Sequence, residues 1–266
     1  MLLADNDPLV GPPPPEVPLR HAPLIRVIAQ IRFPLVVSIE QQEFVTPFQE
    51  ALRSSYPVLR QEQSHGYVLG PGGIVQSPVP RTVWRFSDVS THWRVSLNSE
   101  FLALETTSYT NRADFLSRLR NVVGALDELV EPKLVDRVGV RYIDRITGAD
   151  VNDIAKLVRP EVRGIAGTSL EKSALMAISE NVFDLDDAQL LARWGHIPSG
   201  ETVDPSAIEP IPERSWLLDL DMYTTSAHAF SVDQVVTDAT RFSERLYAFF
   251  RWTVTDEFLR RYGGGQ

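Results

Sequence analysis

Cysteine is absent from this chain of 266 residues, and lysine occurs only at Lys133, Lys156 and Lys172. The lack of thiols excludes disulfides, zinc–thiolate sites and cysteine nucleophiles. The positive charge is therefore nearly all arginine. We attribute this bias first to a GC-rich genome, with selection for guanidinium chemistry as the alternative.

Long hydrophobic runs are also lacking. None approaches the roughly 20 residues that span a bilayer, and no basic segment followed by an apolar one opens the chain as in a secretory signal. We therefore expect a cytoplasmic protein without a membrane partner. The net charge of -9 argues against broad, salt-driven binding to nucleic acids, although a local basic groove remains compatible with it.

Residues 1–21 are predicted to form a proline-rich N-terminal arm. The four prolines at 12–15 favour an extended polyproline II segment without internal hydrogen bonds. We expect this arm to lie over the folded domain, with recognition by a proline-reading partner as the alternative.

The first half of the chain alternates between strand and helix patterns. Leu24 to Phe33 alternates apolar and polar residues, which predicts a half-buried strand. Helices are expected at 43–55, with Pro47 in the first turn, and from a cap at Asn111 to about 130. Further strands are predicted at 83–86, 93–97 and 101–109, together with a short hairpin at 67–75 around a glycine-rich turn.

The second half follows the same order. A central strand is predicted at 134–146, then a short helix at 151–158 capped by Asp150, and strands at 173–183, 189–194 and 215–223. The proline-broken stretch 197–212 reads as a loop. A long helix at 231–262 closes the pattern.

The recurrence of this order predicts an internal duplication within an α+β fold. The expected domains are the arm, a first α+β repeat at 22–133 and a second at 134–266, sharing one mainly antiparallel sheet. Helices would cover one face of that sheet and leave the other open. Such a topology resembles the fold of the TATA-binding protein, which says little about function.

The best candidate for a binding site is the arginine-rich face of the central strand. Residues two apart on a strand lie about 7 Å apart on the same side, a spacing that suits phosphate or carboxylate binding. The candidate binding residues are Arg32, Arg94, Arg137, Arg141, Tyr142 and Arg145.

The alternative is that these arginines pair with carboxylates on neighbouring strands. Glu105, Glu180, Asp219 and Asp221 alternate so as to fall on the same polar faces, where cross-strand pairs would form. Asp219 and Asp221 are also weak candidates for a divalent metal site, whereas residues 184–187 are expected to form an acidic turn. No cofactor and no catalytic residues are predicted.

Three segments together resemble a sporadically distributed bacterial family of uncharacterised proteins of about this length. They are Gln30-Ile31-Arg32-Phe33 after Ala22-Pro23-Leu24, the strand containing Trp84 and Phe86, and Arg137-Val138-Gly139-Val140-Arg141-Tyr142-Ile143-Asp144. The family motif more often has Asn where this chain has Asp144. The patchy distribution implies mobile genes, such as defence or toxin–antitoxin loci.

The sequence thus favours a non-enzymatic binding protein whose partner is another protein or a second copy of itself. The first alternative is a nucleotide-binding, RNA-binding or RNA-processing factor that uses the arginine face. A metal-dependent hydrolase that uses Asp219 and Asp221 is the second alternative.

Overall fold

The computed structural model describes residues 7–64, 67–70, 73–76 and 81–264, which form two compact units. Unit 1 contains the described residues up to Val27, together with Val140–Tyr223 and the chain from Arg241 onward. Unit 2 contains Ile28–Gly139 and Thr224–Thr240. Both units are discontinuous in sequence, and the division into repeats at residue 133 stays a prediction.

The chain has an α+β fold with a nine-stranded sheet in the order β10-β11-β12-β9-β1-β7-β6-β5-β2. Antiparallel pairing joins β2 to β5, β5 to β6, β6 to β7 and β10 to β11. The central neighbours β1 and β9 each contribute residues to both units. The strands of this sheet are β1 (Leu24–Arg32), β2 (Val58–Ser64), β5 (Arg81–Ser87), β6 (Trp93–Asn98), β7 (Phe101–Thr106), β9 (Arg137–Ile146), β10 (Ala177–Leu185), β11 (Ala188–Ile197) and β12 (Ser215–Thr224).

Two small two-stranded sheets contain the remaining described strands. The predicted hairpin is confirmed as β3 (Tyr67–Gly70) paired with β4 (Gly73–Gln76), while its turn at 71–72 lies outside the described residues. The other pair joins β8 (Leu134–Val135) to β13 (His228–Ala229).

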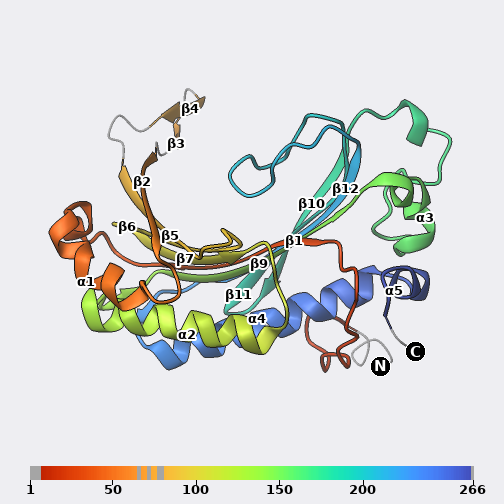
Figure 1. Ribbon diagram of the computed structural model, residues 1–266. Coiled ribbons are helices and arrows are strands. Elements are labelled where there is room, and N and C mark those ends of the chain that lie inside the picture. Colours follow the sequence, from red (N-terminus) through yellow and green to blue (C-terminus); the bar gives the residue numbers. More distant parts are fainter. Residues whose placement is uncertain (1–6, 65–66, 71–72, 77–80, 265–266) are drawn as a thin grey trace. The chain divides into compact units, whose positions relative to one another are not determined.

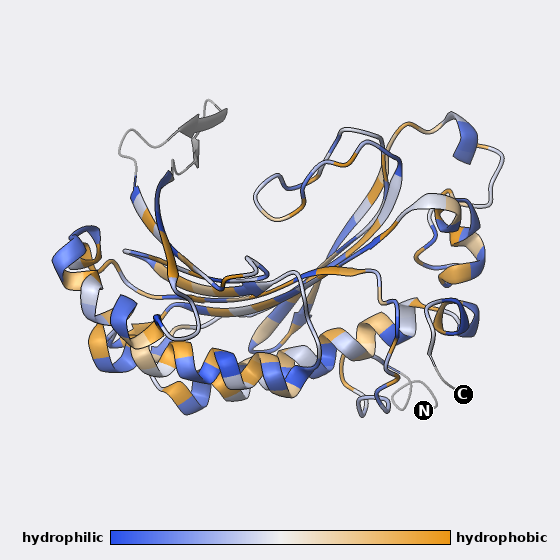
Figure 2. Cartoon of the chain, in the orientation of Figure 1, coloured by the Kyte–Doolittle hydropathy of each residue, from blue (hydrophilic) through white to orange (hydrophobic). Residues whose placement is uncertain are grey.

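In unit 2, helices α1 (Gln42–Leu52) and α2 (Arg112–Leu129) cover one face of β5, β6 and β7 (Figure 1). Apolar residues recur along α2 at helical spacing (Figure 2), so one stripe can face the sheet. Phe48 packs edge-on against Phe86, and Phe115 lies 6.0 Å from the Trp93 ring. As predicted, Asn111 caps α2, accepting a hydrogen bond from Asp114 N.

One detail of α1 differs from the prediction. The helix begins at Gln42, so Pro47 lies in its second turn rather than its first. The side chain of Gln41, the residue before the helix, makes no capping hydrogen bond, so no capping residue marks this start in the sequence. Proline therefore sits where its ring nitrogen cannot donate the usual helical hydrogen bond.

In unit 1, the Arg241–Thr253 part of α4 (Val232–Thr253) packs against the sheet, since Phe249 contacts Phe183 of β10 at 5.6 Å. The helix predicted at 231–262 is in fact two, because α5 (Asp256–Arg261) starts anew. The break occurs where Val254 forms a β-bridge with Val158, and Thr255 then caps α5 by accepting from Phe258 N. Among the described residues, no helix is long and apolar enough to cross a membrane.

The short helix predicted at 151–158 also differs. The chain forms a 3-10 helix, Gly148–Asp153, and then only four α-helical residues in α3 (Ile154–Leu157). Two further 3-10 turns are η2 (Val37–Glu40) and η4 (Glu171–Ser173). Asp150 makes no capping bond, because its carboxylate binds Arg261 and Tyr262 instead.

The arm packs along the C-terminal helices of unit 1. The Tyr247 hydroxyl accepts from Val17 N at 2.7 Å and donates to Pro15 O at 3.2 Å. At the last residue of the arm, His21 N donates to Tyr262 O at 3.1 Å. These bonds hold the extended segment that the proline run favours.

Candidate functional site

Asp219 is the centre of a charged network on one face of the unit 1 sheet. It lies on β12, with only 1% of its side chain exposed. Arg141 of β9 donates from Nε to Oδ1 at 2.7 Å and from Nη2 to Oδ2 at 2.8 Å. Arg193 of β11 donates from Nε to Oδ2 at 3.0 Å. Guanidinium groups from the strands on both sides therefore occupy both oxygens of this buried carboxylate.

Asp204 extends the network from the loop between β11 and β12. Arg141 Nη1 donates to its Oδ2 at 2.8 Å, while Ser206 donates to Oδ1 from its backbone N and from Oγ. Burial opposes ionisation of Asp204, but the hydrogen bonds from Ser206 and Arg141 outweigh it and lower the pKa of this carboxyl. Burial acts to lower the pKa of Arg141, yet Asp219 and Asp204 outweigh it and raise that pKa. Asp204 and Arg141 are thus both charged at neutral pH.

The same loop is held at a second point. Arg145 Nη1 donates to Glu209 O at 2.8 Å, and Arg26 lies 3.9 Å from the Glu209 carboxylate. Ala207 and Ile208 lie in the loop between Asp204 and Glu209, and both are buried. The prediction that the second face of the sheet is open is therefore wrong in unit 1, because the loop covers the arginines of β9.

Charge is nearly balanced within the network. Arg141 and Arg193 face Asp219 and Asp204, and Glu180 of β10 lies 3.9 Å from Arg193. The Nε, Nη1 and Nη2 atoms of Arg141 each donate to a carboxylate. This geometry suits a structural ion-pair network that holds the loop to the sheet better than it suits a binding site for an anion.

The remaining candidates lie in different surroundings. Arg94 in unit 2 pairs with Glu105 on the neighbouring strand β7, as the alternative interpretation predicts. Arg32 is exposed, and its backbone oxygen accepts from Asp136 N. Arg137 and Tyr142 are half-buried and both take part in polar or ring contacts.

The two weak candidates for a metal site, Asp219 and Asp221, have different surroundings. A cation at Asp219 would have to displace two arginines, because both carboxylate oxygens already accept hydrogen bonds. Asp221 is half-buried and engaged in an interaction of its own. In the part of the chain that the structure describes, no three carboxylates or histidines gather as metal ligands would.

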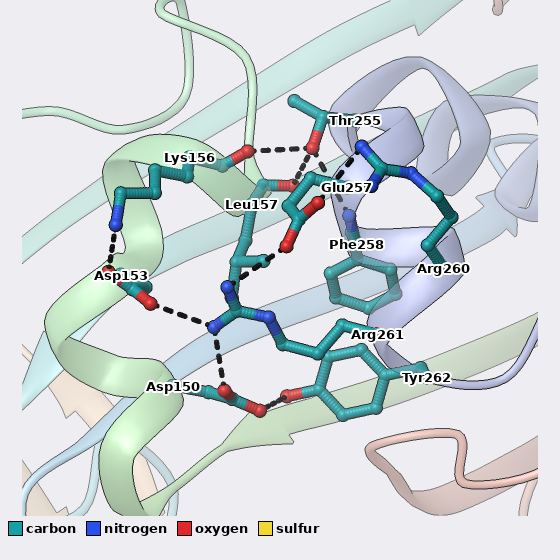
Figure 3. A network of polar contacts seen from close by, with 10 residues as sticks. All are labelled: Asp150, Asp153, Lys156, Leu157, Thr255, Glu257, Phe258, Arg260, Arg261 and Tyr262. Carbon is teal, nitrogen blue, oxygen red and sulfur yellow. Dashed lines mark hydrogen bonds and ion pairs between the residues drawn. The ribbon is translucent and has the colours of Figure 1, made fainter.

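A second polar network, which the sequence did not reveal, joins α5 to the 148–157 segment (Figure 3). Arg261 Nη1 donates to Asp150 at 2.8 Å and to Asp153 at 2.9 Å, and Nη2 donates to Glu257 at 3.1 Å. Tyr262 donates to the other oxygen of Asp150 at 3.0 Å. The only sequence signal is the Glu257–Arg261 spacing of four residues on one helix.

Asp144 is a buried carboxyl on the core side of β9. Burial raises its pKa to about 7, and no hydrogen bond from the described residues reaches it. Its charge in turn contributes to a raised pKa of Tyr262, for which burial is the main cause. With a pKa of about 7, this carboxyl is partly protonated near neutral pH.

Exposed apolar side chains gather at the β10 side of unit 1. Leu175 is 83% exposed, Met176 48% and Val182 58%. Leu175 and Met176 directly precede β10, and Val182 lies on it. Among the described strands β10 ends the strand order, so this part of the surface combines apolar side chains with a sheet edge.

A scan against protein-family models and a search of curated proteins both returned no match for this chain.

Proposed function

We propose that the protein is a non-enzymatic binding protein of the bacterial cytoplasm that recognises a protein partner through unit 1. The observation that carries this proposal is the exposure of Leu175, Met176 and Val182 beside an edge strand. Apolar side chains gain most from leaving water when a protein surface covers them.

The arginine network supports the same view. A nucleotide or RNA site needs guanidinium groups that can meet phosphate, and the Arg141 donors are directed at Asp219 and Asp204. The RNA-binding alternative would therefore require both Asp219 of β12 and Asp204 of the loop to release Arg141 first.

The internal duplication and the topology like that of the TATA-binding protein belong to this proposal as well. The strand order supports them: outward from β1 the order is β7, β6, β5, β2, and outward from β9 it is β12, β11, β10. In each half the first strand thus neighbours the last one. A role in a mobile defence or toxin–antitoxin locus is proposed on the family resemblance alone.

The proposal can be tested by photo-crosslinking in the native cells. A benzoylphenylalanine residue replaces Leu175 in one variant and Val89 in another, both sites being 83% exposed and Val89 lying in unit 2. We expect a discrete protein adduct from position 175 and none from position 89. Absence of adducts at 175, or adducts to RNA instead, would contradict the proposal.

A further inference from the structure

The two edges of the nine-stranded sheet differ in how well they resist pairing. At the β2 edge, Arg60, Gln61, Glu62 and Gln63 are all exposed, a polar sequence that discourages addition of another strand. At the β10 edge, the nine residues Ala-Ile-Ser-Glu-Asn-Val-Phe-Asp-Leu include five apolar ones, among them exposed Val182. Apart from Val58 and Leu59 at its start, β2 is thus polar, and of the two edges β10 has more of the composition of a pairing strand.

The backbone of β10 is engaged on one side. All nine residues are in register with β11, from Ala177 opposite His196 to Leu185 opposite Ala188. Within the described residues, the only further backbone hydrogen bond of β10 is the turn contact from Asp187 N to Leu185 O. The N–H and C=O groups that point away from β11 are thus available for another strand.

The side chains of β10 present two different faces. Phe183 packs on Phe249 of α4, so the odd-numbered residues face the helix side. The even-numbered residues face the other way, where Glu180 approaches Arg193. That second face reads, in order along the strand, Ile178, Glu180, Val182 and Asp184, an alternation of apolar and acidic residues.

Charge on this face selects the occupant. In the described structure neither Asp184 nor Asp186 is joined to a basic side chain, and Glu180 has only the 3.9 Å contact with Arg193. Two β10 strands paired about Val182 would place Glu180 directly opposite Asp184, and like charges in that position destabilise a pair. A second copy of this chain is therefore a poor occupant, whereas basic residues would complement the edge.

We propose that β10 is a docking strand, to which a partner protein adds an extended segment that alternates apolar and basic residues on one face. This inference rests on the proposed function and specifies its partner. The backbone ladder would supply affinity, and the pairing of lysine or arginine with Glu180 and Asp184 would set direction and register.

A matched peptide tests the proposal directly. In an antiparallel pairing, the peptide Lys-Thr-Val-Thr-Lys-Thr-Val places its residues of one face opposite Asp184, Val182, Glu180 and Ile178 in turn. Binding is measured by fluorescence anisotropy, and hydrogen exchange locates the protected amides. We expect binding, slower exchange within 177–185, and no binding of the same peptide with Glu in place of Lys.

Backbone methylation separates strand addition from simple charge attraction. One isomer carries N-methyl groups on its three Thr residues, and the other carries three N-methyl groups on its two Val residues and its second Lys. Because only one edge of a strand can face β10, one isomer should keep its affinity and the other should lose it. Equal binding of both isomers would overturn the proposal.

A charge-reversed protein gives the matched variant. Glu180→Lys with Asp184→Lys should weaken binding of the lysine peptide by about tenfold or more and create binding of the glutamate peptide. Asp127→Lys with Glu128→Lys on α2 makes the same charge change elsewhere and should leave both affinities as they were. Circular dichroism confirms that each variant is folded, and an unaltered preference in the β10 variant would overturn the proposal.

Self-association is the remaining outcome. If sedimentation shows that the protein alone dimerises and that Val182→Lys abolishes this, the occupant is a second copy and the proposal is wrong. The two proposals fail separately. Adducts at position 175 without peptide binding would contradict docking on β10 alone. Absence of adducts would contradict the proposed function, that is, recognition of a protein partner.

Discussion

Arg141 binds Asp219 in a bidentate manner through two hydrogen bonds, Nε to Oδ1 at 2.7 Å and Nη2 to Oδ2 at 2.8 Å. The two residues lie 78 positions apart in the chain, on neighbouring strands β9 and β12. This pair joins the strand that the sequence singles out to the loop that follows β11, because the third Arg141 donor reaches Asp204.

Asp219→Ala should destabilise the protein by about 3 kcal/mol, since it leaves two largely buried guanidinium groups without their shared carboxylate. The free energy of unfolding, measured by urea titration at pH 7, checks this value. Glu128→Gln, which alters an exposed carboxylate on α2, is the control and should change stability little. A loss as small as that of the control would mean that the network adds no stability.

Asp204 makes a pH-dependent contribution to stability. Its folded-state pKa lies below the ordinary 3.8, so its contribution is present above about pH 4 and is lost as pH falls through the lower folded value. At pH 7, Asp204→Asn should therefore cost about 2 kcal/mol of unfolding free energy, the value of hydrogen bonds to a charged group. The difference between wild type and variant should shrink as the pH of the titration falls progressively below 3.8, and a constant difference would contradict the assignment.

Sequence patterns predicted the strands well where one face is apolar. Val27, Ala29 and Ile31 of β1 alternate and are buried as expected. By contrast, β2 was not predicted, because its exposed polar residues on both faces leave no period to detect. The position of β2 in the sheet is set by its antiparallel pairing with β5.

The candidate site was predictable only in part. Alternation placed Asp219 and Arg141 on polar faces, so their pairing was among the stated alternatives. The contact with Asp204 was not foreseen, because it joins a strand to an irregular loop 63 residues away, where no local period applies. The break at Val254 escaped prediction for the same reason, since a bridge to distant Val158 outweighs local helix propensity.

Asp144→Asn should stabilise the protein at alkaline pH. The folded-state pKa of about 7 exceeds the ordinary 3.8, so the folded state holds the proton more tightly and stability falls as pH rises between these values. The penalty is complete above pH 7 and on the order of 4 kcal/mol at most, from 1.36 kcal/mol per pKa unit.

Unfolding titrations of wild type and Asp144→Asn at pH 4 and pH 8 check this prediction. The variant should gain stability relative to wild type at pH 8 and gain little at pH 4, where the wild-type carboxyl is protonated in the folded state. A variant that is less stable at pH 8 would show that the buried carboxylate is stabilised by a partner rather than penalised by burial.

Tyr247→Phe should loosen the arm without unfolding unit 1. The hydroxyl is both the acceptor for Val17 N and the donor to Pro15 O, and the arm has few other hydrogen bonds because its prolines lack N–H groups. Exchange of the Val17 amide should therefore become faster, and trypsin should cleave after exposed Arg20 more readily. Tyr223→Phe, which removes a hydroxyl that donates to Gln189 at 3.2 Å, is the control. Equal exchange at Val17 in both variants would mean that packing of the arm, rather than this hydroxyl, holds it in place.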